Sequence, residues 1–224
     1  MGETDLSDFS YEEWVAFFFA HGVDVYGDLW DKYDLSVQPR QPERLIAHLT
    51  RLCQEFSTLP TLYSWGQINQ GVWAVLSHPG GMAEALMRPN APLELRLECV
   101  RAMYHVYADA IAHLEPALPM ENGFYMWWEL IGDCFCLSAG HGGDRPFLPK
   151  DADARQMHDT ILSTLVRVLQ LGEERCASAA LHGLGHLHHP DGAGIVQEYI
   201  DKRQGSLSPE DLEWLQQCRD GTVM

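Results

Sequence analysis

Basic residues are scarce in this sequence. Its 224 residues include 32 Asp and Glu against 15 Lys and Arg, which gives a formal net charge of −17. Only three of the basic residues are lysines. Proteins that bind nucleic acid or an anionic membrane through phosphate attraction need a basic face. The charge therefore argues against both partners and favours either a basic protein partner or simple solubility.

Long apolar runs are also missing. The longest, WVAFFFA at 14–20, has seven residues, whereas a membrane helix needs about 20. No Lys or Arg precedes Lys32, although a signal peptide starts with basic residues. We therefore expect a cytoplasmic protein with no membrane association. The six cysteines are irregularly spaced in a chain too large to need disulfides, so we expect reduced, mostly buried thiols.

Motifs that identify common enzymes are absent. The chain has no P-loop, no G-x-S-x-G motif and no Rossmann glycine pattern. Cys134 and Cys136 are two positions apart, which is not the C-x-x-C spacing of a zinc site. We therefore predict a non-catalytic protein without a cofactor.

Helical periodicity is present throughout, and strand-like alternation is nearly absent. Apolar residues over 92–115 recur every three or four positions and form one stripe. SYEE at 10–13 has the pattern of a capping box, and SPED at 208–211 offers a Ser cap followed by Pro. We predict an all-α fold. The predicted helices are 10–20, 24–34, 41–57, 61–77, 81–87, 92–115, 123–139, 151–171, 173–188, 191–204 and 208–218.

These helices are expected to form antiparallel pairs: 41–57 with 61–77, 92–115 with 123–139, 151–171 with 173–188, and 191–204 with 208–218. The segment EERCASAALHGLGHLHHPDGAGIVQEYI resembles the HEAT-like repeats of the phycobilisome-lyase group and of many bacterial adaptor proteins. The residues that carry the resemblance are Ala177, Ala180, Leu184, Gly185, Leu187, Pro190 and Ala193. It implies an irregular α-solenoid. We predict a single domain, with capping helices over 1–34 and degenerate helix-pair repeats over 41–224.

Four histidines, His182, His186, His188 and His189, fall within eight positions. On a helical wheel His182, His186 and His189 lie opposite the apolar face, which predicts a polar contact surface. The i, i+4 spacing of His182 and His186 also allows two imidazoles to bind one zinc ion. However, the H-E-x-x-H glutamate is absent, and no third ligand is evident from sequence spacing. A metal-dependent hydrolase or lyase that uses this pair is the alternative.

Acidic and aromatic residues alternate in DVYGDLWDKYD at 24–34. One interpretation is a capping helix with a solvated acidic face. The other is a recognition surface on which acids steer a basic partner and an aromatic side chain anchors it. Adjacent Trp127 and Trp128 raise the same question, because both fit a core only if their helix is widely buried. The candidate partner-binding residues are Asp24, Asp28, Trp30, Asp31, Asp34, Trp127, Trp128, His182, His186 and His189.

Small, acidic bacterial proteins of this architecture resemble immunity proteins, which occlude a basic toxin domain. That resemblance implies one basic protein partner, and it is the leading hypothesis. A scaffold or assembly factor for a cofactor-bearing protein is a further alternative.

Overall fold

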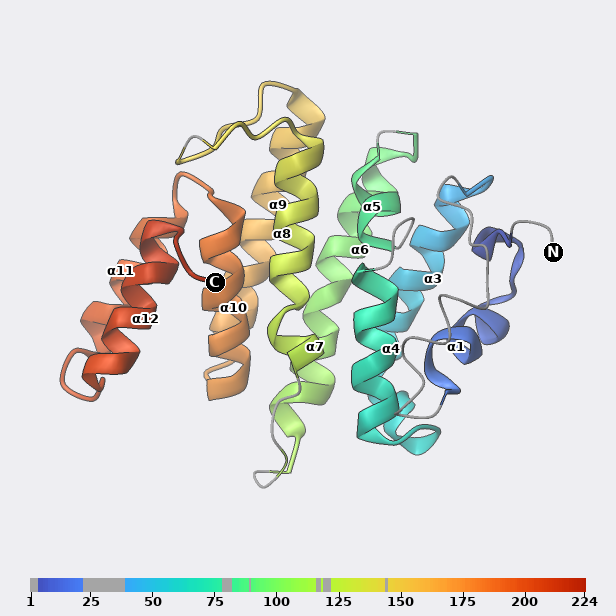
Figure 1. Ribbon diagram of the computed structural model, residues 1–224, viewed down its shortest axis with the longest axis horizontal. Coiled ribbons are helices and arrows are strands. Elements are labelled where there is room, and N and C mark those ends of the chain that lie inside the picture. Colours follow the sequence, from blue (N-terminus) through green and yellow to red (C-terminus); the bar gives the residue numbers. More distant parts are fainter. Residues whose placement is uncertain are drawn as a thin grey trace. The chain divides into compact units, whose positions relative to one another are not determined.

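Every element that the structure describes is helical (Figure 1), which confirms the all-α prediction. The helices gather into two compact units, Met1–Phe124 and Tyr125–Met224, and the single-domain prediction stays a prediction. None of the described helices combines the length and apolar character needed to cross a bilayer. The computed structural model describes residues 4–21, 39–77, 82–88, 90–115, 118, 122–143 and 145–224.

In the first unit α3 packs on α6 and α5, while α4 packs on α1. The predicted pairing of 41–57 with 61–77 is therefore wrong, because the segment η2 redirects the chain between α3 and α4. The elements of this unit are η1 (Leu6–Asp8), α1 (Tyr11–Phe19), α3 (Pro42–Gln54), η2 (Phe56–Thr61), α4 (Trp65–Ser77), α5 (Met82–Met87), α6 (Leu93–His105), η3 (Val106–Ala110) and η4 (Ile111–His113).

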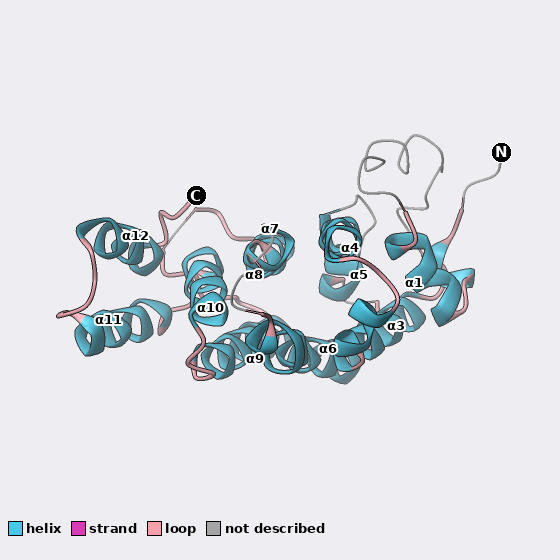
Figure 2. Cartoon of the chain, turned by 90° about the horizontal axis from the view of Figure 1, so that it is seen from below, coloured by secondary structure: helices cyan, strands magenta, loops and turns pink. Residues whose placement is uncertain are grey.

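The second unit is arranged around α10, which contacts α8, α9, α11 and α12. Figure 2 shows α8, α10 and α12 in one row, with α9 and α11 in a second row. The predicted pairs 151–171 with 173–188 and 191–204 with 208–218 are confirmed as α9–α10 and α11–α12. The bounds are α8 (Trp127–Ser138), α9 (Ala152–Leu169), α10 (Glu174–Leu187), α11 (Gly192–Arg203) and α12 (Pro209–Asp220), and α7 (Asn122–Tyr125) lies at the boundary between the units.

Local capping signals fix two helix starts as predicted. The Ser10 hydroxyl accepts the Glu13 N–H at 3.3 Å, and the Glu13 carboxylate accepts the Ser10 N–H at 2.8 Å. Ser208 and Asp211 repeat this capping box at the start of α12. Each pair satisfies backbone donors that the first helical turn leaves without a partner.

Two predicted helices differ from the observed ones. The helix expected over 92–115 changes at Val106 into a π turn, and then into a 3-10 turn from Ile111. The buried Tyr107 hydroxyl in that π turn donates to the Phe124 carbonyl at 2.8 Å. The helix expected over 123–139 is interrupted at Met126 and forms α7 and α8.

Small residues let α10 lie close to its neighbours. A Cβ added at Gly183 would stand 2.3 Å from Cβ of Trp128, which is far inside van der Waals contact. The two helices can approach this closely only because the position has no side chain. Trp127 and Trp128 are both fully buried, so the expectation that one of them faces a partner is wrong. Their helix is covered widely enough to bury both indoles.

Candidate metal centre

His182 and His186 lie one turn apart on α10, and both face α8. His182 is fully buried, and its ring stacks on Tyr125 with the centroids 4.2 Å apart. The His186 side chain is 14% exposed. The predicted polar contact face is therefore wrong for His182, because α10 is enclosed by helices and has no broad solvent face.

Glu129 on α8 meets both histidines. Its Oε2 lies 3.5 Å from Nε2 of His182 and 3.6 Å from Nε2 of His186. The donor atoms of the three side chains all lie within 4.8 Å of one another. Glu129 is a third candidate ligand that sequence spacing did not reveal, since it is far from both histidines along the chain.

Polar atoms of this cluster are buried without hydrogen bonds. They are Oε2 of Glu129, Nε2 of His186 and both ring nitrogens of His182. Buried polar atoms are almost always hydrogen-bonded, because leaving one unpaired costs about 1–3 kcal/mol. Oε2 of Glu129 faces Nε2 of both histidines, so one cation between these three atoms would satisfy all of them.

The spacing fits a tetrahedral metal ion. Zinc bonds of about 2.0–2.1 Å to nitrogen and oxygen place neighbouring donor atoms roughly 3.3 Å apart. The two contacts of Glu129, at 3.5 and 3.6 Å, are already close to that value. The widest separation in the set is at most 4.8 Å, so binding an ion would bring the donor atoms closer by up to roughly 1.5 Å.

Supporting contacts hold both rings in orientation. Oδ1 of Asp133 lies 3.2 Å from Nδ1 of His186, so a proton on Nδ1 leaves Nε2 free to bind a metal. Carboxylate–histidine pairs of this kind orient metal ligands in many proteins. On the other side, Nε1 of Trp214 donates to the Tyr125 hydroxyl at 3.2 Å, which fixes the ring that stacks on His182.

Burial shifts the ionisation of the cluster. It lowers the pKa of His182 to about 4, and nearby His186 acts in the same direction, while the Tyr125 carbonyl opposes the shift without making a hydrogen bond of normal geometry. Burial also raises the pKa of Glu129; His186 opposes this shift and Asp133 adds to it. A neutral imidazole is the form that binds metal, and a bound cation would compensate the carboxylate.

The other candidate residues do not join this cluster. His189 follows the end of α10, where its Nε2 lies 3.1 Å from Oδ1 of Asp159. It is 9% exposed, so it offers little contact surface. The acidic and aromatic candidates Asp24, Asp28, Trp30, Asp31 and Asp34 lie outside the described residues.

Comparison with protein families, with characterised proteins and with solved structures finds no match to this chain. The resemblance of 173–200 to HEAT-like repeats therefore stays a prediction.

Proposed function

We propose that this protein binds a divalent transition-metal ion, zinc foremost, between Glu129, His182 and His186, and uses it in metal-dependent hydrolysis. The observation that carries the proposal is the convergence of buried polar atoms without hydrogen bonds. The proposal takes up the alternative that the His182–His186 spacing left open.

The donor set favours a transition metal over calcium or magnesium. Two imidazoles and one carboxylate suit zinc and related ions, whereas calcium and magnesium prefer oxygen ligands. Structural zinc sites use four protein ligands, and catalytic sites use three and leave one position to water or substrate. Among the described residues the cluster has three members, which supports the catalytic type. A metal-bound water of lowered pKa is the nucleophile that such a site supplies.

The test is the metal content and activity of the untagged protein. We expect about one zinc per chain after zinc loading, and a cobalt derivative with the intense visible absorption of a tetrahedral site. Glu129→Gln and His186→Gln should lose the ion. His105→Gln is the matched control, because this exposed imidazole pairs with Asp109 in the first unit. Wild-type protein that takes up no zinc at micromolar concentration would overturn the proposal.

The hydrolytic part has its own readout. We expect zinc-dependent cleavage of p-nitrophenyl acetate that chelator abolishes and Glu129→Gln lacks. If one zinc ion binds per chain but the ester is not cleaved, the metal-binding part of the proposal is confirmed and the hydrolytic part is wrong.

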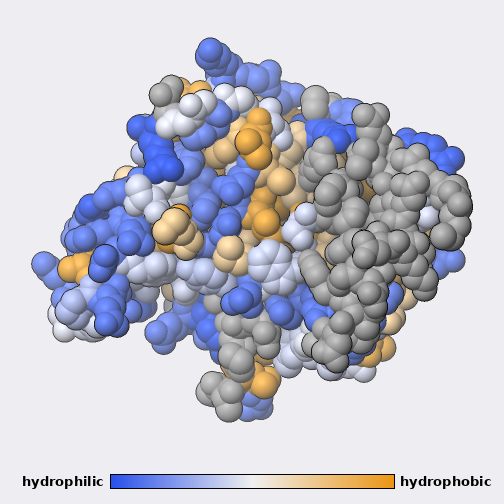
Figure 3. All heavy atoms as spheres, in the orientation of Figure 1, coloured by the Kyte–Doolittle hydropathy of each residue, from blue (hydrophilic) through white to orange (hydrophobic). Residues whose placement is uncertain are grey.

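A basic protein partner remains a second proposal. The net charge of −17 supports it. Figure 3 shows that the surface at its left, over α11 and α12, is mostly hydrophilic, although its colours do not separate acidic from basic residues. An immunity protein of HEAT-like architecture is the specific form of this proposal. It predicts that a basic protein co-purifies with the chain and that the rate of their association falls with added salt.

A further inference from the structure

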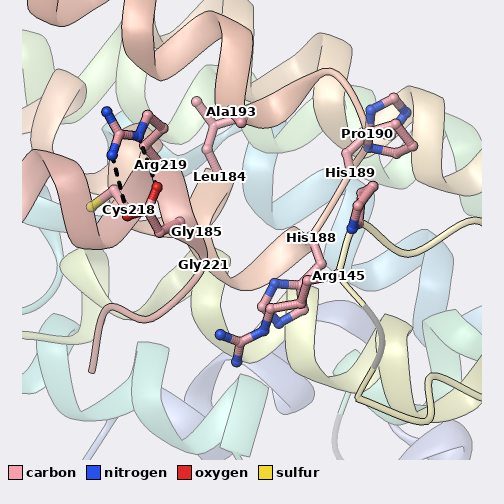
Figure 4. A pocket seen from close by; sticks show the side chains of 12 residues that line it. Arg145, Leu184, Gly185, His188, His189, Pro190, Ala193, Cys218, Arg219 and Gly221 are labelled. Atoms are coloured by element: carbon pink, nitrogen blue, oxygen red, sulfur yellow. Dashed lines mark hydrogen bonds and ion pairs between the residues drawn. The ribbon is translucent and has the colours of Figure 1, made fainter.

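A second site of different chemistry lies beyond the C-terminal end of α10. It is a cavity of about 210 Å³, which is large enough for a small organic ligand. Four segments of the second unit line it: the end of α10, the start of α11, the end of α12, and the loop at 145–146 (Figure 4). None of the proposed metal ligands is among its lining residues.

Close contacts define the walls of this cavity. Gly221 ends α12 at φ 65°, and a Cβ there would stand 2.7 Å from Nδ1 of His188. The loop is tied to the same residue, because the Phe147 N–H donates to the His188 carbonyl at 2.8 Å. The α12 end and the loop are thus both held against His188, so the cavity is formed before any ligand enters.

Two arginines and one acid supply the formal charges that line the cavity: Arg145, Arg219 and Asp220. Arg219 donates from Nε and Nη2 to Asp220, at 2.8 and 3.2 Å, and from Nη1 to Gln197 at 2.8 Å. These bonds use three of the five N–H groups of a guanidinium and hold its plane in place. Arg145 makes no hydrogen bond or ion pair with any residue that the structure describes. Among the lining residues that the structure describes, the formal charges sum to one excess positive charge.

The rest of the lining is apolar. Leu184 and Ala193 line it together with Pro146 and Pro190. A guanidinium beside an apolar wall suits a ligand with a charged head and a short hydrocarbon body.

We propose that this cavity binds a small aliphatic monocarboxylate, whose carboxylate pairs with Arg145 and whose alkyl chain contacts Leu184 and Ala193. The guanidinium of Arg145, which has no partner among the described residues, can neutralise the single charge of a carboxylate. Arginine offers two parallel N–H groups to a carboxylate, and this fixes the orientation of the ligand. The proposal does not depend on the metal centre.

Calorimetric titration with butyrate tests the proposal, with chelator present so that carboxylate binding to a metal is excluded. We expect saturable binding at one site per chain, and none of butyramide, which has the same shape without the charge. Arg145→Gln should weaken butyrate binding at least about tenfold. Arg203→Gln is the matched control, because it removes the same charge from a side chain that lies over Tyr199, outside the cavity.

A second pair of variants tests the position of the ligand. Ala193→Leu puts bulk into the cavity from an exposed helix position and should abolish binding. Gly194→Leu introduces the same leucine side chain at the next position. A Cβ there meets nothing within 4 Å, so this variant should bind butyrate as the wild type does. Equal weakening by Arg145→Gln and Arg203→Gln would overturn the proposal, as would inorganic phosphate that binds more tightly than butyrate.

Discussion

The two units bury their acidic, basic and imidazole side chains differently. In the first unit these groups have partners: the Arg96 guanidinium donates to the Leu86 and Met87 carbonyls at 2.6 and 3.0 Å, and Nε2 of His48 lies 3.1 Å from the Phe9 carbonyl. In the second unit Glu129 and His182 are buried without hydrogen bonds at their facing atoms.

This difference separates side chains that stabilise the fold from side chains held for a ligand. A buried group with all its hydrogen bonds made contributes to stability or costs little, whereas an unpaired one is a net cost that the rest of the fold must offset. Such costs concentrate at functional sites. The comparison therefore predicts that neutralising a buried acid lowers the unfolding free energy in the first unit and does not lower it in the second. It also predicts that, on acidification, the second unit loses stability at a higher pH than the first.

The largest expected effect is the acid response of the second unit through His158. This residue is 1% exposed, and burial lowers its pKa to about 4, although a contact of 3.0 Å with the Leu187 carbonyl opposes the shift. The unfolded chain takes up a proton near pH 6.5 and the folded chain only near pH 4. Stability from this group is therefore complete above about pH 6.5 and falls as the pH drops to 4. The loss amounts to about 3 kcal/mol.

Urea unfolding between pH 7 and 4 measures that loss. His158→Gln keeps a donor for the Leu187 carbonyl but cannot titrate, so it should reduce the loss of unfolding free energy between pH 7 and 4 by about 3 kcal/mol. The pH dependence that comes from His182, whose pKa burial also lowers to about 4, should remain. Hydrogen exchange should show the amides of α9 and α10 losing protection before those of α3. Identical pH profiles for the wild type and the variant would contradict the prediction.

The next effect tests whether close helix packing creates the metal centre. Gly183→Ala places a methyl group 2.3 Å from Cβ of Trp128, an atom that cannot rotate away. We expect a loss of roughly 2–3 kcal/mol in unfolding free energy and, because α8 must move away, loss of zinc binding. Gly194→Ala is the control, since its Cβ meets open space. Zinc affinity that survives a large loss of stability would show that the spacing of α8 and α10 does not set the site.

A smaller effect is expected in the first unit from Asp5→Asn. Burial alone would raise the pKa of Asp5, but hydrogen bonds from Ser7 and Arg40 outweigh it and lower the pKa to about 2. Relative to the ordinary value of 3.8, this contributes about 2 kcal/mol near neutral pH. The contribution is complete above about pH 4 and is lost as the pH falls through 2. Urea unfolding should show wild type and variant differing at neutral pH and converging in acid.

Signals that act within one or two turns could be predicted from the sequence, and contacts between distant helices could not. The capping boxes at Ser10 and Ser208 depend on residues three positions apart, and both are confirmed. Glu129 precedes His182 by more than fifty residues, so its contact depends on how α8 and α10 pack. The one local hint was the pair of acids, Glu129 and Asp133, within the apolar helix WWELIGDCF.

The wrong prediction that His182 lies on a solvent-facing surface of α10 has a related cause. A helical wheel identifies a polar face but cannot tell water from another helix. His182 was expected on that face as a contact surface, and it faces Glu129 and Tyr125. Its neighbours there are a carboxylate and an aromatic ring, and both suit an imidazole that is buried.

The smallest change in unfolding free energy is expected for Glu129→Gln, and this variant decides the comparison between the two units. In chelator, the substitution removes a buried carboxylate that no hydrogen bond compensates at Oε2. We expect the unfolding free energy to stay the same or to rise by less than about 1 kcal/mol, in contrast to the loss at Asp5. Zinc should reverse the order of wild type and variant. An ion at 100 times its dissociation constant stabilises the protein that binds it by about 2.7 kcal/mol, and the variant cannot gain this. Urea unfolding with and without zinc measures both differences, and a variant that is less stable in chelator by as much as Asp5→Asn would place Glu129 among the structural residues.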